Sequence, residues 1–324
     1  MKGFNEKLDL RQKLLNNNTH RYLNYIEYIS NAKTIYISPD GEINRIPFYL
    51  LNSYDEKILL GKTKKIIKLT TGRELLELAQ NKKIAKNMPL ILANPKFETR
   101  RIKKRDSNNL NFLRPKKRLY NNKFKNWSQL PGTALEGEKI SKILKSKLLT
   151  KDDATAIAVM NYESPEILHI ASHSFFISDD EFLEDPLLRS GVVLAGANNA
   201  SNNKKDDGYL TALEFSKLNL QGTELVVISG CDSGVGEINI GEGVYGLKRA
   251  ITIAGSRSSL LTLWPVSDFA TVNFMKIFYE NLKIGLGKYD ALFNTQEFFR
   301  NHPNKQYRHP FYWAAFQLSG DWRP

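Results

Sequence analysis

The chain has one cysteine, Cys231, among its 324 residues, which excludes any disulfide within it. No run approaches the roughly 18 apolar residues that a membrane-spanning helix needs, and residues 1–30 lack the apolar stretch and cleavage pattern of a secretory signal. These absences predict a cytoplasmic protein, in which a free thiol stays reduced. The length, with 41% apolar residues, suits one large or two moderate globular domains.

Acidic residues are scarce, because 47 Lys and Arg stand against 34 Asp and Glu, a net charge of +13. Lysine is abundant throughout, but residues 96–125 concentrate the excess, with twelve basic and two acidic side chains. Such a stretch is either a solvated insertion or a patch that binds an anion or a partner, nucleic acid included. The sequence leaves both interpretations open.

The order of apolar and polar segments predicts three parts. Residues 1–31 form an N-terminal helical segment, residues 32–126 a smaller α/β part that contains the basic insertion, and residues 127–324 the catalytic part. In the last part strands and helices alternate, which is typical of a mostly parallel sheet covered on both faces. Strands are expected near residues 34–38, 43–51, 89–93, 166–171, 191–195, 224–229, 258–263 and 313–318.

Two segments have the spacing of a helix capping box, in which a threonine and a glutamate three residues later satisfy each other's free amides. One is Thr133 with Glu136, which predicts a helix to about residue 146. The other is Thr211 with Glu214.

Cys231 and His173 each follow a buried strand directly, one after 224–229 and the other after 166–171. Because ligands and reaction sites collect at the carboxyl ends of parallel strands, we expect the thiol and the imidazole to meet there. A neighbouring imidazole can raise the thiolate fraction or accept the proton during attack. The pair is therefore a candidate catalytic dyad. A lone cysteine is otherwise usually inert packing.

The remaining site predictions follow from position in the chain. The backbone amides of Ser174 and Cys231 are the natural oxyanion donors. His169 lies inside the apolar strand and is interpreted as buried packing. No metal and no cofactor is predicted, since His169 and His173 are four apart on a strand-to-loop segment and no second cysteine exists. Residues expected to line a substrate cleft are Ser229, Gly230, Asp232, Trp264 and Asp268.

Several runs together resemble the CHAT domain family, caspase-like peptidases related to separase and associated with tetratricopeptide repeats. The resemblance extends from about residue 33 to the C-terminus. The runs that carry it are Ser38-Pro39-Asp40-Gly41-Glu42, Leu130-Pro131-Gly132-Thr133, Leu168-His169-Ile170-Ala171-Ser172-His173, Val227-Ile228-Ser229-Gly230-Cys231-Asp232-Ser233-Gly234, Leu263-Trp264-Pro265-Val266-Ser267-Asp268 and His309-Pro310-Phe311-Tyr312-Trp313.

The resemblance implies a caspase-like three-layer α/β/α sandwich and cysteine-peptidase chemistry with His173 and Cys231. It also implies a protein substrate, control by a regulatory repeat or sensor module, and a bacterial defence or cell-death setting. Two positions depart from relatives: Ser174 stands where glycine commonly follows the histidine, and Ser229 stands where metacaspase-like proteins carry the aspartate that binds a basic side chain. The alternatives are a catalytically silent module that binds a protein or nucleic acid, and a different Cys-His acyl-transfer enzyme.

Overall fold

The computed structural model describes residues 32–40, 43–44, 46–51, 58–80, 83–98, 126–176, 186–202, 206–230 and 240–324. Cys231 and Asp232 lie outside these residues, as do the N-terminal helical segment predicted at 1–31 and nearly all of the basic insertion. The described residues contain no helix long and apolar enough to span a membrane.

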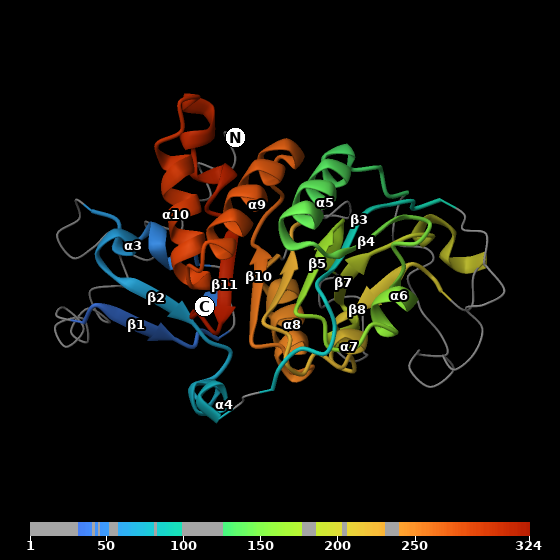
Figure 1. Ribbon diagram of the computed structural model, residues 1–324, viewed down its shortest axis with the longest axis horizontal. Helices are drawn as coiled ribbons and strands as arrows, with labels where there is room; N and C mark the ends of the chain where they lie inside the picture. The colour runs from blue at the N-terminus through green and yellow to red at the C-terminus, as the bar shows by residue number, and fades with distance from the viewer. Residues whose placement is uncertain are drawn as a thin grey trace.

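An eight-stranded sheet organises the molecule, with the strand order β1-β2-β11-β10-β9-β5-β3-β4 (Figure 1). All its neighbouring strands are parallel except β10 and β11. Strands from the predicted smaller part and the predicted catalytic part thus share one sheet. Its strands are β1 Thr34–Ile37, β2 Lys65–Lys68, β3 Leu90–Pro95, β4 Lys147–Lys151, β5 Ile167–Ala171, β9 Leu225–Ile228, β10 Ser258–Thr262 and β11 Phe316–Gly320.

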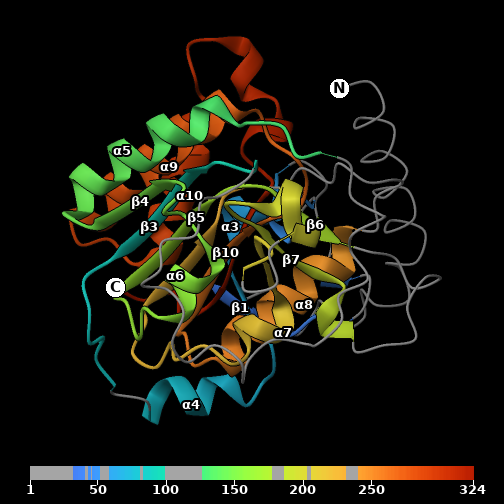
Figure 2. The same cartoon turned by 90° about the vertical axis from the view of Figure 1, so that its right-hand side faces the viewer.

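Helices cover both faces of this sheet, so its central strands are buried and apolar throughout. Figure 2 shows α5 (Pro131–Leu144), α9 (Asp268–Lys283) and α10 (Lys288–Arg300) grouped on one side. Alternate strand residues divide accordingly, because Ile91 packs toward these helices and Leu92 joins the core on the opposite face. The predicted three-layer α/β/α sandwich with a mostly parallel sheet is confirmed.

The opposite face carries α8 (Ile240–Ile253), α7 (Ala212–Phe215), α6 (Ala156–Met160) and a small antiparallel sheet. That sheet has the order β6-β7-β8, with β6 Ser174–Phe176, β7 Ser190–Val193 and β8 Tyr209–Thr211. The shorter elements are α3 Leu60–Thr63, α4 Glu74–Gln80, and the 3-10 helices η3 Phe48–Leu50, η7 Pro186–Leu188, η8 Ala197–Asn202, η9 Lys305–Arg308 and η10 Pro310–Tyr312.

Two local predictions were wrong. The return strand expected at 43–51 is absent from the described residues of that range, which include η3, and β1 pairs instead with β2. The capping box expected at Thr133 and Glu136 does not form. The helix begins at Pro131 with Leu130 as its N-cap, three residues before the expected one, and the Glu136 side chain binds His169 instead of the helix end. The second box, Thr211 with Glu214, is confirmed in both directions.

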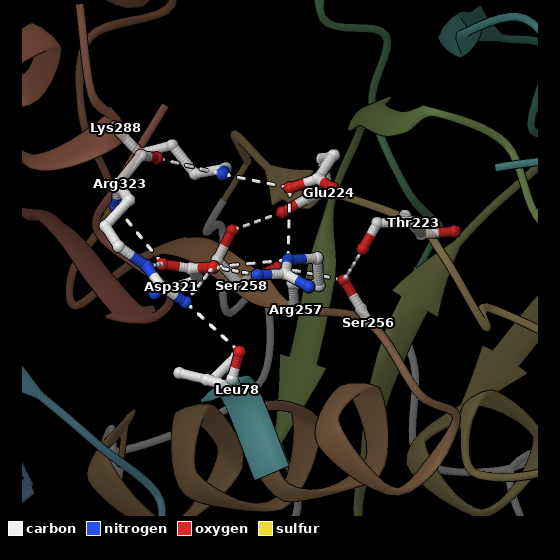
Figure 3. A network of polar contacts seen from close by, with 9 residues as sticks. All are labelled: Leu78, Thr223, Glu224, Ser256, Arg257, Ser258, Lys288, Asp321 and Arg323. Atoms are coloured by element: carbon white, nitrogen blue, oxygen red, sulfur yellow. Dashed lines mark hydrogen bonds and ion pairs between the residues drawn. The ribbon is translucent and has the colours of Figure 1, made fainter. Parts of the chain in front are cut away.

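A network of charged side chains lies at the end of the sheet where β9 and β10 begin, opposite the predicted site (Figure 3). Asp321, just after β11, is 1% exposed and accepts hydrogen bonds from Arg257, at the start of β10, and from Arg323. Lys288 of α10 and Arg257 both pair with Glu224, which precedes β9. The network thus ties the C-terminal residues to the beginnings of β9, β10 and α10.

This network makes the free energy of unfolding decrease as the pH falls into the acid range. Burial alone raises the pKa of Asp321, but the hydrogen bonds from Arg323 and Arg257 outweigh it and lower the pKa to about 2. A carboxyl with a depressed folded pKa contributes stability above its unfolded value of about 4, and this contribution is lost as pH falls toward 2. We expect up to ~2 kcal/mol from this group. Urea unfolding at pH 5 and pH 2.5 measures this contribution. The free energy of unfolding should change less between the two pH values in Asp321→Asn than in wild type, and equal changes would contradict the assignment to Asp321.

Candidate functional site

The pairing of β5 with β9 brings the two predicted catalytic segments together. The strands are parallel neighbours in which Ile170 is registered with Ile228. His173 and Cys231 each lie three residues beyond this pair in the sequence. The described stretch 206–230 ends at Gly230, the residue bonded to Cys231, so the position of the thiol itself is a prediction.

Gly230 contacts both residues that flank His173 in the sequence, the backbone of Ser172 and the side chain of Ser174. A Cβ atom at this glycine would stand 1.7 Å from the carbonyl oxygen of Ser172, so no other residue fits without displacement. On the other side, the Ser174 hydroxyl donates to the Gly230 carbonyl across 2.8 Å. Ser229, 7% exposed, donates its amide to the Ile170 carbonyl. Four predicted site residues, His173, Ser174, Ser229 and Gly230, are therefore neighbours.

The imidazole of His173 is held in one orientation. Its Nε2 lies 2.7 Å from the Ser128 carbonyl oxygen. Because a carbonyl only accepts, Nε2 carries the hydrogen, and in the neutral ring Nδ1 is then the nitrogen that can accept a proton. The backbone carbonyl of Ser128 thus does what a third catalytic residue would do, which is to fix the tautomer and stabilise the protonated ring.

Two aromatic rings pack against His173, which is 1% exposed. Phe97 lies 5.2 Å and Trp127 5.1 Å from it, measured between ring centroids. Asn198 of η8 holds both segments, since its amide donates to the Phe97 carbonyl and its side chain bonds with the Trp127 backbone. Trp127 in turn donates from its indole to the Tyr209 hydroxyl. Phe97 lies at the start of the basic insertion and Trp127 two residues after its end, so described residues from both ends of this segment pack on His173.

His169 is buried, as interpreted from the sequence, but both its ring nitrogens are used. Nδ1 lies 3.0 Å from the Tyr279 hydroxyl of α9, and Nε2 lies 3.0 Å from a carboxylate oxygen of Glu136 in α5. The Ser229 hydroxyl is 3.5 Å from the same Nε2. This polar group therefore lies directly beneath the segment that leads to Cys231.

Asp268 connects the beginnings of α5 and α9. Its carboxylate accepts a hydrogen bond from the Gly132 amide at 2.5 Å. Burial raises its pKa, the Gly132 hydrogen bond opposes this, Glu136 raises it further and His173 lowers it; the net direction is upward.

The other predicted cleft residues differ in accessibility. Trp264 lies just after β10, is 8% exposed and donates its indole N–H to the Phe311 carbonyl, so its ring belongs to the core. Asp232 is outside the described residues. Among the residues that the structure describes, no group of three or more His, Cys, Asp or Glu is placed to hold a metal ion.

Sequence reasoning missed the groups that hold His173 in place. Phe97, Trp127 and Ser128 are separated from it by 45 residues or more, and nothing in a local pattern marks a backbone carbonyl as an acceptor. Glu136 was assigned to a cap. The signal in the sequence was a large aromatic residue, Trp127, close behind a strongly basic stretch. In the structure this ring is buried, with 5% exposure.

A model of the CHAT domain family matches residues 12–321 of the chain. Tetratricopeptide repeat protein 28 of Mus musculus and that of Homo sapiens are each 33% identical to this chain over 111 residues. These residues make up 34% of this chain but only 4% of the length of each relative. Two structural similarities are weaker. The Arg-specific cysteine proteinase gingipain R gives a TM-score of 0.41 at 7% identity, covering 79% of this chain and 54% of that one. The Saccharomyces cerevisiae separase-securin complex gives 0.47 at 13% identity, covering 88% and 15%.

The close approach at Gly230 predicts a large effect of a small change. Gly230→Ala should cost at least ~2 kcal/mol of stability, because a backbone atom cannot move aside as a flexible side chain does. Gly72→Ala is the matched control, since an added methyl there meets nothing within 4 Å, and a change within about 0.5 kcal/mol is expected. Denaturant unfolding measures both. Equal stability of the two variants would refute the packing of Gly230 on Ser172.

Proposed function

The chain belongs to the CHAT domain family, whose model matches residues 12–321, and on that premise we propose that it is a cysteine peptidase with His173 and Cys231 as its dyad. The observation that supports this most directly is the register of β5 with β9, in which Ile170 pairs with Ile228, because His173 and Cys231 each follow this pair by three positions in the sequence. The Ser174 hydrogen bond to Gly230 supports it independently.

The proposed reaction divides peptide hydrolysis into two steps. The sulfur of Cys231 attacks the peptide carbonyl carbon while Nδ1 of His173 holds the thiol proton, and the C–N bond breaks as that proton passes to the leaving amine. Water, deprotonated by the same nitrogen, then hydrolyses the thioester and restores the thiol. The amides of Ser174 and Cys231 are the proposed donors to the oxyanion.

We also propose a protein substrate and control by a repeat or sensor module. His173 is 1% exposed, so a substrate reaches the imidazole only after its cover moves. A curated relative is by name a tetratricopeptide repeat protein, which supports a repeat module as the regulator. The bacterial defence setting and the cytoplasmic location remain predictions from the sequence.

The first test uses the single thiol of the chain. Cys231→Ala should keep the fold and abolish cleavage, and His173→Ala should slow it by about a hundredfold to ten-thousandfold, the usual contribution of a general base. His302→Ala, in η9's neighbourhood and away from β5, is the control. The measurement compares new protein N-termini in cells expressing each variant together with the candidate regulator.

Alkylation of Cys231 separates the peptidase from the silent module without any substrate. A dyad thiol should react with iodoacetamide at neutral pH faster than a model thiol, and His173→Ala should remove the excess rate. Wild-type reactivity no higher than the model thiol, together with no cleavage, would favour the silent interaction module. Modified but uncleaved targets would favour another acyl-transfer reaction.

Ser174 provides a graded test. Ser174→Ala removes the hydroxyl that holds the Gly230 carbonyl, a hydrogen bond of about 0.5–1.5 kcal/mol. If that bond positions the cysteine segment, kcat should fall about threefold to tenfold, while KM changes little and stability falls by no more than the value of the hydrogen bond. Loss of stability with unchanged kcat would assign Ser174 a purely structural role.

A further inference from the structure

A small cavity lies where β2 separates from β11. Only one residue pair, Ser319 with Lys68, is registered between these strands, and α10 covers the opening between them (Figure 1). The cavity has a volume of about 40 Å³. It is three strands away from β5 in the sheet order, so it is separate from the proposed peptidase site.

Lys68 provides a buried cation at this cavity. The residue is 7% exposed, and its ammonium donates to two neutral oxygens, the Asn44 carbonyl at 2.9 Å and the Gln317 side chain at 2.5 Å. It forms no ion pair with any described carboxylate. Buried charges in proteins are normally paired, because an unpaired one keeps the cost of leaving water.

A second lysine near Lys68 adds to the excess of positive charge around the cavity. Lys248 of α8 is also buried and donates to the side chain of the same Asn44 at 3.0 Å. Burial, and then the charge of Lys248, lower the pKa of Lys68 well below its ordinary value. Burial lowers the pKa of Lys248 to about 8, and Glu74 opposes that shift. A bound anion at Lys68 would stabilise its ammonium form.

A second donor at the cavity is unused. Arg300, at the end of α10, lines the cavity, and its Nε–H is buried with no hydrogen-bond partner in the described structure. Its Nη1 is paired with Glu297. Gln296, also in the lining, donates from its amide nitrogen to two backbone carbonyls at 3.4 and 3.5 Å and hydrogen-bonds with Tyr49. The lining therefore offers more donors than acceptors.

The rest of the lining is apolar and aromatic. Phe48 lies 5.8 Å from the Lys68 ammonium, measured to the ring centroid, and Tyr289 and Phe293 stack nearly parallel on α10. In this measure of volume a water occupies about 10–15 Å³, so 40 Å³ holds about three to four atoms of water size. A nucleotide or a peptide backbone is too large.

We propose that this cavity binds a small organic monoanion, a carboxylate carrying a short apolar group. The carboxylate accepts hydrogen bonds from Lys68 and from the Arg300 Nε–H, and the apolar group packs against Phe48 and the rings of α10. A divalent or larger anion fits less well, because the walls are apolar and the volume is small.

Propionate is a suitable probe, and the full chain is the sample. At constant ionic strength, sodium propionate should raise the melting temperature in a saturable way, and calorimetry should give one site per chain. Propionamide, the uncharged isostere, and sodium chloride should produce neither effect. Equal responses to propionate and propionamide would overturn the proposal.

Lys68→Met should weaken propionate binding at least tenfold. Lys62→Met in α3 removes the same charge from a nearby exposed position and should bind as wild type does. If Lys68→Met fails to fold, Arg300→Gln makes the second test and should also weaken binding. Unchanged affinity in both cavity variants would refute the site. Tighter binding of a blocked glutamate than of propionate would also overturn it, because the carboxylate would then belong to a protein side chain.

Discussion

The pairing of β5 with β9 is the constraint on which the candidate site depends. A parallel pair aligns the ends of its strands, and the registration of Ile170 with Ile228 sets how far each following segment extends. Gly230 then packs directly on the Ser172 backbone. A shift of one residue would turn each side chain of the strand to the opposite face. The geometry proposed for catalysis is therefore fixed mainly by backbone packing, with side chains refining it.

Beneath these strand ends, polar side chains connect the sheet to the helices above it. His169 of β5 bonds in the core to Glu136 of α5 through one ring nitrogen and to Tyr279 of α9 through the other. A half-satisfied buried network is costly, and one Glu136 oxygen has no hydrogen-bond partner in the described residues. Because the partners lie on three elements, the network fixes how the helices sit over the sheet. Asp268 does the same at the helix beginnings by binding the Gly132 amide.

The two capping-box patterns show what a sequence can and cannot predict. Both have threonine and glutamate at the same spacing, and local chemistry alone predicts the same structure twice. At Thr211 the prediction holds, because Glu214 is free to reach back to its own helix end. At Thr133 it fails, because Glu136 meets His169, a residue 33 positions away. The buried strands were predictable from their apolar runs. The prediction of a return strand at 43–51 was wrong, because β1 pairs instead with β2, which lies further along the chain.

The environment of His173 also links the basic insertion to the candidate site. Phe97 and Trp127 flank the insertion in sequence and pack on the imidazole in space. Asn198 links the two segments, because it hydrogen-bonds to the backbone of Phe97 and to the backbone of Trp127. Ser128, whose carbonyl fixes the His173 tautomer, directly follows Trp127. The described residues on either side of the insertion are therefore both anchored beside the ring that carries the proposed base.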